Sequence, residues 1–299
     1  MTQGLPLDSD PFATIAAILE RESGIEFGEE AQASFDRRLG RQLVASGFRS
    51  YREYAQYLAG LPRGHVDIQA VLEPLTIKET YFLREAQQIE AFIDEAKRAA
   101  ETAARAQGGS MLGGRSELQR LTIWCAGCST GEEAYSIAIL IAESRAIDLS
   151  RVRIFATDIS KKAIETARKA VYGPSSFRAI PRDIKNRYFV SQGEGDLVRE
   201  IVRSTARFAC ANILDPERVI GQVDAIFCRN VLIYFSNAAR QNAIQIFCDH
   251  LQPGGILCLG HSESLLNVDS PFEPISSPAG ILYRKPRATI PPSPPRKMP

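Results

Sequence analysis

From residue 120 onward, short apolar segments that suit buried strands alternate with segments of helical periodicity. The strand segments are RLTIWCA at 120–126, RVRIFATD at 151–158, VDAIFCRN at 223–230 and GGILCLGH at 254–261. Continuous apolar strands are typical of parallel sheets buried on both faces, and their alternation with helices indicates helices on both sides of the sheet. The pattern therefore predicts an α/β domain with a doubly wound sheet over residues 118–285.

The first part of the chain shows helical periodicity instead. Apolar residues recur at helical spacing in PFATIAAILERES at 11–23, ASFDRRLGRQLVAS at 33–46 and SYREYAQYLAG at 50–60. A chain of 299 residues is long enough for two domains that each bury a core. We therefore expect a small all-helical N-terminal domain over 11–90, then a linker helix and a flexible, glycine-rich connection over 91–117.

Two shorter segments depart from the strand and helix alternation. A Gly-Glu-Gly turn at 193–195 is followed by the alternating segment VREIVRSTARFA, which predicts a small antiparallel β insertion at about 186–210. The tail PRATIPPSPPRKMP at 286–299 is rich in proline and is predicted to be disordered.

Composition restricts the possible partners. Lys and Arg total 36 against 35 Asp and Glu, so attraction to an anionic partner must come from local clusters, and no nucleic-acid partner is expected. The N-terminus lacks the basic and apolar parts of a signal peptide, and no apolar run approaches the roughly 18 residues of a membrane span. We expect a cytoplasmic protein without membrane insertion.

Cys125 and Cys128 follow the first predicted strand and resemble the dithiol of a thioredoxin. The next helix, however, is predicted to begin after Ser129 or Thr130, which are good N-caps, with two glutamates in its first turn. Those carboxylates would raise the pKa of a nearby thiol, so we favour packed, unreactive cysteines. No metal site is expected, because no second Cys or His pair has ligand spacing.

The loop after the first strand indicates a different ligand. It contains Gly127 and Gly131, and doubly wound folds approach adenosine ligands at the carboxyl ends of their strands. The three-glycine dinucleotide fingerprint is absent, whereas a carboxylate-rich loop suits a cationic ligand with hydroxyls. The second strand ends in Asp158, which could bind both ribose hydroxyls or could instead cap the following helix. A cationic adenosine ligand is S-adenosylmethionine.

Six motifs follow one another along the chain: LTIKETYFLRE at 75–85, CSTGEEAYSIA at 128–138, FATDIS at 155–160, ANIL at 211–214, DAIFCRNVLIYF at 224–235 and LQPGGILCLGHSESL at 251–265. In these motifs the chain resembles the chemotaxis receptor methyltransferases of the CheR family, which esterify receptor glutamates using S-adenosylmethionine. The resemblance covers about residues 11–285. It implies that the second domain is a Rossmann-like, S-adenosylmethionine-dependent methyltransferase domain that releases S-adenosylhomocysteine.

The resemblance also implies site residues. Those that would bind the cofactor are Lys78, Thr80, Arg84, Glu132, Glu133, Asp158, Asn212, Ile213, Asn230 and Val231. Arg84 and Tyr234 would be catalytic, with Tyr234 near the transferred methyl group. Which of the two adjacent glutamates faces the cofactor stays open, and Lys78 departs from the asparagine that the family usually has at this position.

The implied reaction needs no general base, because a glutamate carboxylate is already ionised at pH 7. The implied partner is the helical cytoplasmic domain of methyl-accepting chemotaxis receptors, and a monomer is expected. Arg37, Arg38 and Arg41 gather on one side of a predicted helix and would dock an acidic receptor helix, unless they form an ordinary solvated face. Two alternatives remain: a methyltransferase of the same build for a non-chemotaxis sensory array, and a non-catalytic S-adenosylmethionine-binding module.

Overall fold

The computed structural model describes residues 10–27, 39–40, 43–44, 46–76, 78–106, 120–216, 220–265 and 268–287. The described part of the N-terminal domain is helical, as predicted, with α1 at Pro11–Ser23, α3 at Tyr51–Ala59 and α4 at Val66–Leu72. Asp10 and Ser50 cap α1 and α3 through their side chains. The three helices bury a common apolar core that includes Ile15, Leu19, Tyr54, Leu58, Ile68 and Leu72.

The second domain is built on a seven-stranded sheet with the order β6-β2-β1-β7-β8-β10-β9. Its strands are β1 Leu121–Ala126, β2 Val152–Asp158, β6 Ala206–Cys210, β7 Val223–Cys228, β8 Leu251–Leu259, β9 Glu273–Ser277 and β10 Gly280–Arg284. The first five strands in that order are parallel, and β10 runs antiparallel to both β8 and β9. All four strands predicted from apolar runs are confirmed.

Helices cover both faces of this sheet. They are α5 Ala86–Ala106, α6 Glu132–Ser144, α7 Lys161–Lys169 and α10 Asn237–His250. Alternate residues of β1 belong to separate cores, because Ile123 packs with α5 and α6 whereas Trp124 packs with α10. A strand buried on both faces explains why the apolar run in the sequence shows no polar alternation. The doubly wound fold is confirmed.

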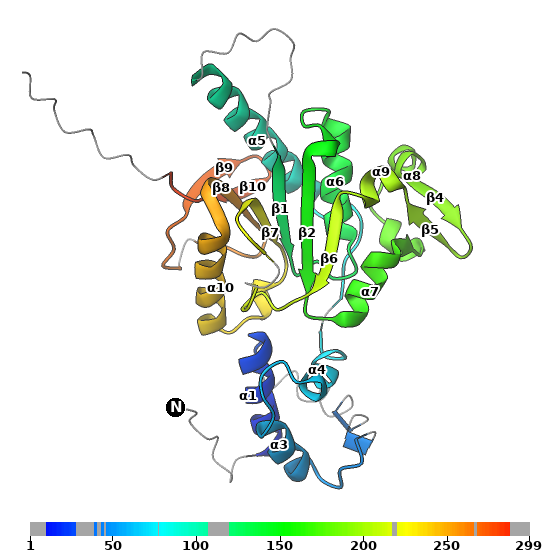
Figure 1. Ribbon diagram of the computed structural model, residues 1–299, viewed down its shortest axis with the longest axis vertical. Coiled ribbons are helices and arrows are strands. Elements are labelled where there is room, and N and C mark those ends of the chain that lie inside the picture. The colour runs from blue at the N-terminus through cyan, green and yellow to red at the C-terminus, as the bar shows by residue number, and fades with distance from the viewer. Residues whose placement is uncertain are drawn as a thin grey trace, which may run out of the picture.

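A small antiparallel sheet extends beyond the β6 edge of the large sheet (Figure 1). It has the order β3-β5-β4, with β3 at Val171–Tyr172, β4 at Phe189–Gln192 and β5 at Gly195–Val198, and the short helices α8 Arg182–Tyr188 and α9 Glu200–Arg203 flank it. The predicted extent of about 186–210 is wrong at its carboxyl end. Residues 206–210 form β6, which pairs with β2 in the large sheet. β6 is an edge strand whose residues are mostly partly exposed, so its sequence lacks the continuous apolar run of the central strands, which explains the misassignment.

The helical domain lies beyond the carboxyl ends of the parallel strands (Figure 1). Backbone hydrogen bonds join the domains, since Ser236 N donates to Gly24 O at 3.0 Å and Glu26 N donates to Tyr234 O at 2.8 Å. Gly24 has a φ of 79°, and a Cβ there would approach the Leu214 side chain to 2.9 Å. The turn after α1 is therefore fitted closely to the second domain.

The linker region is only partly described. The predicted division between residues 90 and 91 falls within α5, while residues 107–119 and 288–299, which hold most of the predicted connection and tail, lie outside the described residues. The domain division as a whole stays a prediction. Within the described ranges, no helix has the length and apolar character needed to cross a membrane.

Candidate functional site

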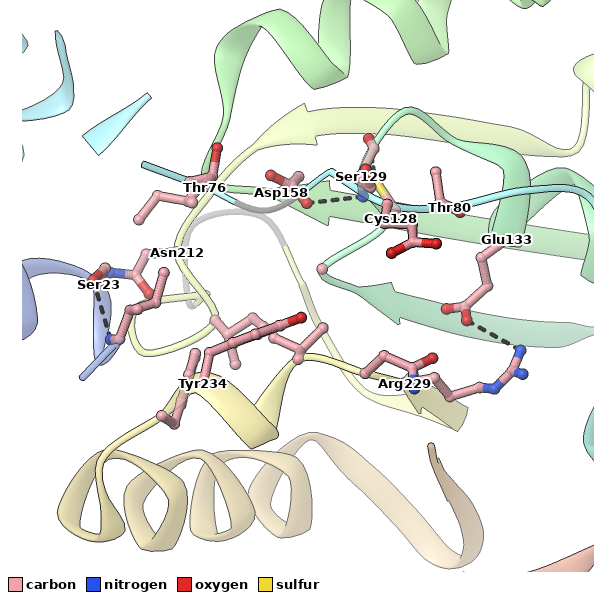
Figure 2. Close-up of a pocket in the computed structure, with 18 of the residues that line it drawn as sticks. Ser23, Thr76, Thr80, Cys128, Ser129, Glu133, Asp158, Asn212, Arg229 and Tyr234 are labelled. Carbon is pink, nitrogen blue, oxygen red and sulfur yellow. Dashed lines mark hydrogen bonds and ion pairs between the residues drawn. The ribbon is translucent and has the colours of Figure 1, made fainter. Parts of the chain in front are cut away.

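A cavity of about 390 Å³ lies between the helical domain and the carboxyl ends of β1, β2 and β7 (Figure 2). Its walls contain nine of the residues predicted for the site, namely Thr80, Arg84, Glu133, Asp158, Asn212, Ile213, Asn230, Val231 and Tyr234. Ser23, Glu26 and Phe27 from the helical domain also line it and were not predicted. The cavity therefore joins residues that are more than 200 positions apart in the chain.

The loop after β1 forms the first wall. Gly127 N and Cys128 N both donate to Thr157 O, at 2.8 and 2.9 Å, which ties the loop to the end of β2. The predicted N-cap was wrong, because Gly131 occupies that position with a φ of 96°. A Cβ on Gly131 would approach Ala167 to 2.8 Å, so the loop has room only for glycine there.

Glu132 and Glu133 begin α6 and point to different places. Glu132 is buried and accepts hydrogen bonds from Ser176 Oγ at 2.9 Å and Thr130 Oγ1 at 2.6 Å, away from the cavity walls. Glu133 lines the cavity. Glu133 is therefore placed to meet a ligand, whereas the structure does not bring Glu132 to the cavity, and its cofactor contact stays a prediction.

Asp158, at the end of β2, is held by two backbone groups. Its Oδ2 accepts from Ser129 N and its Oδ1 from Ser160 N, each at 2.8 Å. The N-cap of α7 is Ser160, whose Oγ accepts from Ala163 N at 3.0 Å, so Asp158 is not the helix cap. Burial raises the pKa of Asp158, and the two N–H groups oppose that rise. Each carboxylate oxygen keeps a free lone pair for a ligand hydroxyl.

Arg229, the first residue after β7, was not predicted as a site residue. Its side chain is 1% exposed and forms ion pairs with Glu133 and Glu85, both at 3.2 Å. Its Nε donates to Gln88 Oε1 at 2.9 Å, and its Nη2 donates to the carbonyl of Arg84 at 2.7 Å. Arg229 therefore connects the β1 loop to the start of α5. An arginine that directly follows a continuous apolar strand was the available signal.

Arg84 and Lys78 come from the segment that leads into α5. Arg84 lines the cavity, and its Nη1 donates to Glu79 O at 3.1 Å. Lys78 turns away and forms an ion pair with Glu73 at 2.5 Å, and Glu73 also accepts from Ser160 Oγ at 2.6 Å. The structure therefore does not bring the ammonium group of Lys78 to the cavity, because that group joins a contact between the end of α4 and the start of α7, and cofactor binding by Lys78 stays a prediction.

The far wall comes from the segments after β6 and β7. Asn212 donates through Nδ2 to Glu22 O at 2.5 Å, which adds another contact between the domains. Tyr234 lies in the short helix η3, Leu232–Tyr234, across the cavity from Asp158 and Ser129 (Figure 2). The wall thus combines the polar group of Asn212 with the aromatic ring of Tyr234 and the apolar side chains of Ile213 and Val231.

The cysteine pair is not arranged for redox chemistry. Cys125 and Cys128 are free and buried. Burial raises the pKa of both thiols well above the ordinary value, and the nearby carboxylate of Glu133 raises it further. A reactive dithiol requires the opposite shift. The interpretation of these residues as packed, unreactive thiols agrees with this environment.

The electrostatics of the cavity suit a cation that carries hydroxyls. Among the described residues, its walls contain four carboxylates and only two guanidinium groups, those of Arg84 and Arg229. The charge of Arg229 is already balanced by its ion pairs with Glu133 and Glu85. Asp158 offers acceptors for hydroxyls, and Ile213, Val231 and Phe235 offer apolar contact for a flat ring. These groups fit S-adenosylmethionine. The predicted docking residues Arg37, Arg38 and Arg41 lie outside the described residues.

Comparison with known proteins supports this fit. A family model described as "CheR methyltransferase, SAM binding domain" matches residues 78–281, and one described as "CheR methyltransferase, all-alpha domain" matches residues 10–65. Chemotaxis protein methyltransferase 2 of Vibrio cholerae is 32% identical over 84% of this chain and 84% of its own length. The chemotaxis protein methyltransferase of Salmonella typhimurium is 32% identical over 91% of this chain and 90% of its own length. The probable biofilm formation methyltransferase WspC of Pseudomonas aeruginosa is 30% identical over 90% of this chain and 60% of its own length.

Proposed function

Because this chain belongs to the CheR family and is an S-adenosylmethionine-dependent methyltransferase of chemotaxis receptors, we propose that it esterifies glutamates on their helical cytoplasmic domain. The observation that carries the proposal is the cavity that both domains line, with Glu133, Asp158 and Tyr234 around it. The protein would act as a monomer in the cytoplasm, without nucleic acid and without membrane insertion.

We assign the cofactor contacts as follows. Asp158 accepts hydrogen bonds from the ribose hydroxyls, and Glu133, with Thr80 nearby, faces the cationic methionine end. Asn212 and Ile213 flank the adenine, and Asn230 and Val231 line the remaining wall. These assignments are supported by the position of each residue in the cavity walls. When bound, the cofactor supplies a methyl group on a positively charged sulfur.

The residues of the chain then act by position and by excluding water. The glutamate carboxylate of the receptor forms the new bond to the methyl carbon, while the electron pair of the broken bond stays on sulfur and no proton moves. Arg84 and Tyr234 would limit the movement of the incoming carboxylate. A site that holds opposite charges in line and away from water favours a reaction in which those charges neutralise each other.

A second candidate is methylation in a different sensory array. It rests on the similarity to WspC, whose name assigns it to biofilm formation and of which this chain spans 60%. The two candidates share the reaction and the site, and they differ only in the receptor.

The test is transfer of tritiated methyl groups from S-adenosylmethionine to membranes that contain the organism's receptors. We expect label on receptors that base treatment releases as methanol, because carboxyl methyl esters are base-labile. Membranes from strains that lack the chemotaxis receptors, or lack the receptor of another array, separate the two candidates. Label that resists base would exclude glutamate as the acceptor.

The predicted docking face can be tested by charge reversal. Changing Arg38 and Arg41 together to glutamate should raise the KM for receptor and leave cofactor affinity unchanged, because none of the residues assigned to the cofactor comes from this predicted helix. Single exposed pairs contribute only about 0.2–1 kcal/mol, so the double variant is the informative one. Lys97→Glu with Arg98→Glu, on the exposed face of α5, makes the same charge change as a control. Unchanged receptor kinetics at low salt would move the docking site elsewhere.

A further inference from the structure

The carboxylate of Glu263 accepts four backbone hydrogen bonds. Its Oε2 accepts from Asn230 N at 2.7 Å and from Gly260 N at 2.6 Å. Its Oε1 accepts from Val231 N at 2.9 Å and from Ile233 N at 3.3 Å. Glu263 does not line the cavity, so its side chain binds the backbone of residues 230–233 from behind the cavity wall.

The segment that Glu263 holds carries Asn230 and Val231, which were assigned to the cofactor wall, and Tyr234, which was assigned to the methyl transfer. Asn230 has a φ of 59°, in the left-handed region that side chains other than glycine rarely adopt. Val231 fits closely against the β1 loop, because a Cβ on Gly127 would approach its Cγ2 to 2.6 Å. Tyr234 follows within one turn. An unfavourable backbone conformation persists only when its surroundings enforce it, and three of the four N–H groups that Glu263 binds belong to this segment.

A second side chain holds the same turn from behind. Arg240 Nη2 donates to Leu232 O at 3.2 Å, while Glu263 binds N–H groups of the turn. A small cavity of about 30 Å³ lies there, lined by Leu232, Ile233, Arg240 and Glu263 among others. Arg240 Nε is buried and has no hydrogen-bond partner among the described residues. The turn is therefore held by charged side chains on the side away from the transfer site.

We propose that Glu263 is a positioning residue for methyl transfer, which fixes Asn230, Val231 and Tyr234 by binding the backbone N–H groups of their loop. The inference rests on the proposed function, because it takes Tyr234 to lie beside the transferred methyl group. Glutamine has the size of glutamate, but its amide nitrogen cannot accept a hydrogen bond. Each carboxylate oxygen of Glu263 accepts from two backbone N–H groups. In Glu263→Gln, the amide NH2 replaces one of these oxygens, so two N–H groups would face a donor in place of an acceptor.

The experiment measures three quantities in Glu263→Gln. The kcat for methyl transfer to receptor should fall about 10- to 100-fold, because a misplacement of about 1 Å can cost that much. The Kd for S-adenosylhomocysteine should change less than about threefold, because Asp158 and Glu133, which carry the strong, charged contacts, lie on other elements, whereas Asn230 and Val231 contribute only neutral contacts. Hydrogen exchange of residues 230–235, measured without ligand, should accelerate locally.

Asp224→Ala is the matched control. Asp224 lies at the opposite end of β7 and accepts a single backbone hydrogen bond, from Thr122 N at 2.8 Å. An unchanged kcat in Glu263→Gln overturns the inference. The inference is also overturned if Asp224→Ala loses as much stability as Glu263→Gln and its kcat falls by the same factor. If Glu263→Gln does not fold, Glu263→Asp, which keeps the charge but is shorter by one methylene, should show the same separation of kcat from Kd.

The exchange measurement separates two failures. If the wild-type protein transfers no methyl group, the proposed function fails, and the exchange of residues 230–235 still tests whether Glu263 holds the loop. Unchanged exchange in Glu263→Gln overturns the inference in either case.

Discussion

Replacing Arg229 with methionine should lower the free energy of unfolding by about 3–5 kcal/mol, the range for breaking a buried ion pair. The side chain is 1% exposed and pairs with Glu133 and Glu85. Methionine fills similar space but leaves two carboxylates without their counter-ion and leaves Gln88 without its donor. Chemical denaturation followed by circular dichroism measures the loss.

The same variant should change cofactor binding in a way that depends on pH. Burial raises the pKa of Glu133, and Arg229 opposes that rise. Without Arg229 the pKa of Glu133 should rise further, so as the pH is lowered Glu133 should lose its charge at a higher pH in the variant than in the wild type. Affinity for S-adenosylmethionine, measured by calorimetry, should therefore decrease more steeply in the variant than in the wild type as the pH is lowered.

Two further variants decide the cause. Arg203→Met breaks an ion pair with Glu200 in which the two side chains are 41% and 68% exposed, so it should cost less than about 1 kcal/mol. Adding Glu133→Gln to Arg229→Met removes one uncompensated charge and should restore part of the stability. A loss in Arg229→Met no larger than that in Arg203→Met would show that the buried network contributes little.

Asp158→Asn should weaken cofactor binding by about 1.5–3 kcal/mol, the range for hydrogen bonds to a charged group. That loss corresponds to roughly 10- to 150-fold in Kd. Asparagine keeps the size of aspartate but turns one acceptor into a donor, so one of the N–H groups of Ser129 and Ser160 also loses its partner. Calorimetry with S-adenosylhomocysteine measures the change without turnover.

The control for Asp158 addresses its neighbouring helix. Ser160, which caps α7, is untouched, so hydrogen exchange in α7 should stay close to that of the wild type. If α7 exchanged faster while cofactor affinity was unaffected, Asp158 would serve the helix and not the cofactor. Ser160→Ala, which removes the cap itself, provides the reference for a frayed helix.

The fold was predictable because its signals are local. Strands buried on both faces leave continuous apolar runs, and the residues from Leu121 to Ala126 form such a strand in the structure. The boundary of the small β insertion was misplaced at β6, an edge strand whose residues are mostly partly exposed. Patterns over five residues cannot distinguish such a strand from one in a separate antiparallel sheet.

The candidate site was predictable only where a single position carries the signal. Asp158 sits at the end of β2, where strand order places it at the ligand-binding edge. Glu133, at the start of α6, was implied by the family resemblance, which left it open between Glu132 and Glu133. Arg229 was missed because its role depends on Glu85 and Gln88, which lie more than 140 positions away in the chain. The ion pair of Lys78 was missed because the sequence pattern gave no sign that Glu73, five positions earlier, accepts from both Lys78 and Ser160.

The walls of the cavity come from both domains, with Ser23 and Glu26 from the helical domain and Asp158 and Tyr234 from the second domain. A ligand bound there belongs to neither domain alone, and the unfolding of either one releases it. At a concentration 100 times its Kd, such a ligand stabilises the folded state by about 2.7 kcal/mol. Occupancy therefore couples the unfolding of the two domains, so the cofactor acts as a structural link that makes a two-domain chain melt as one cooperative unit.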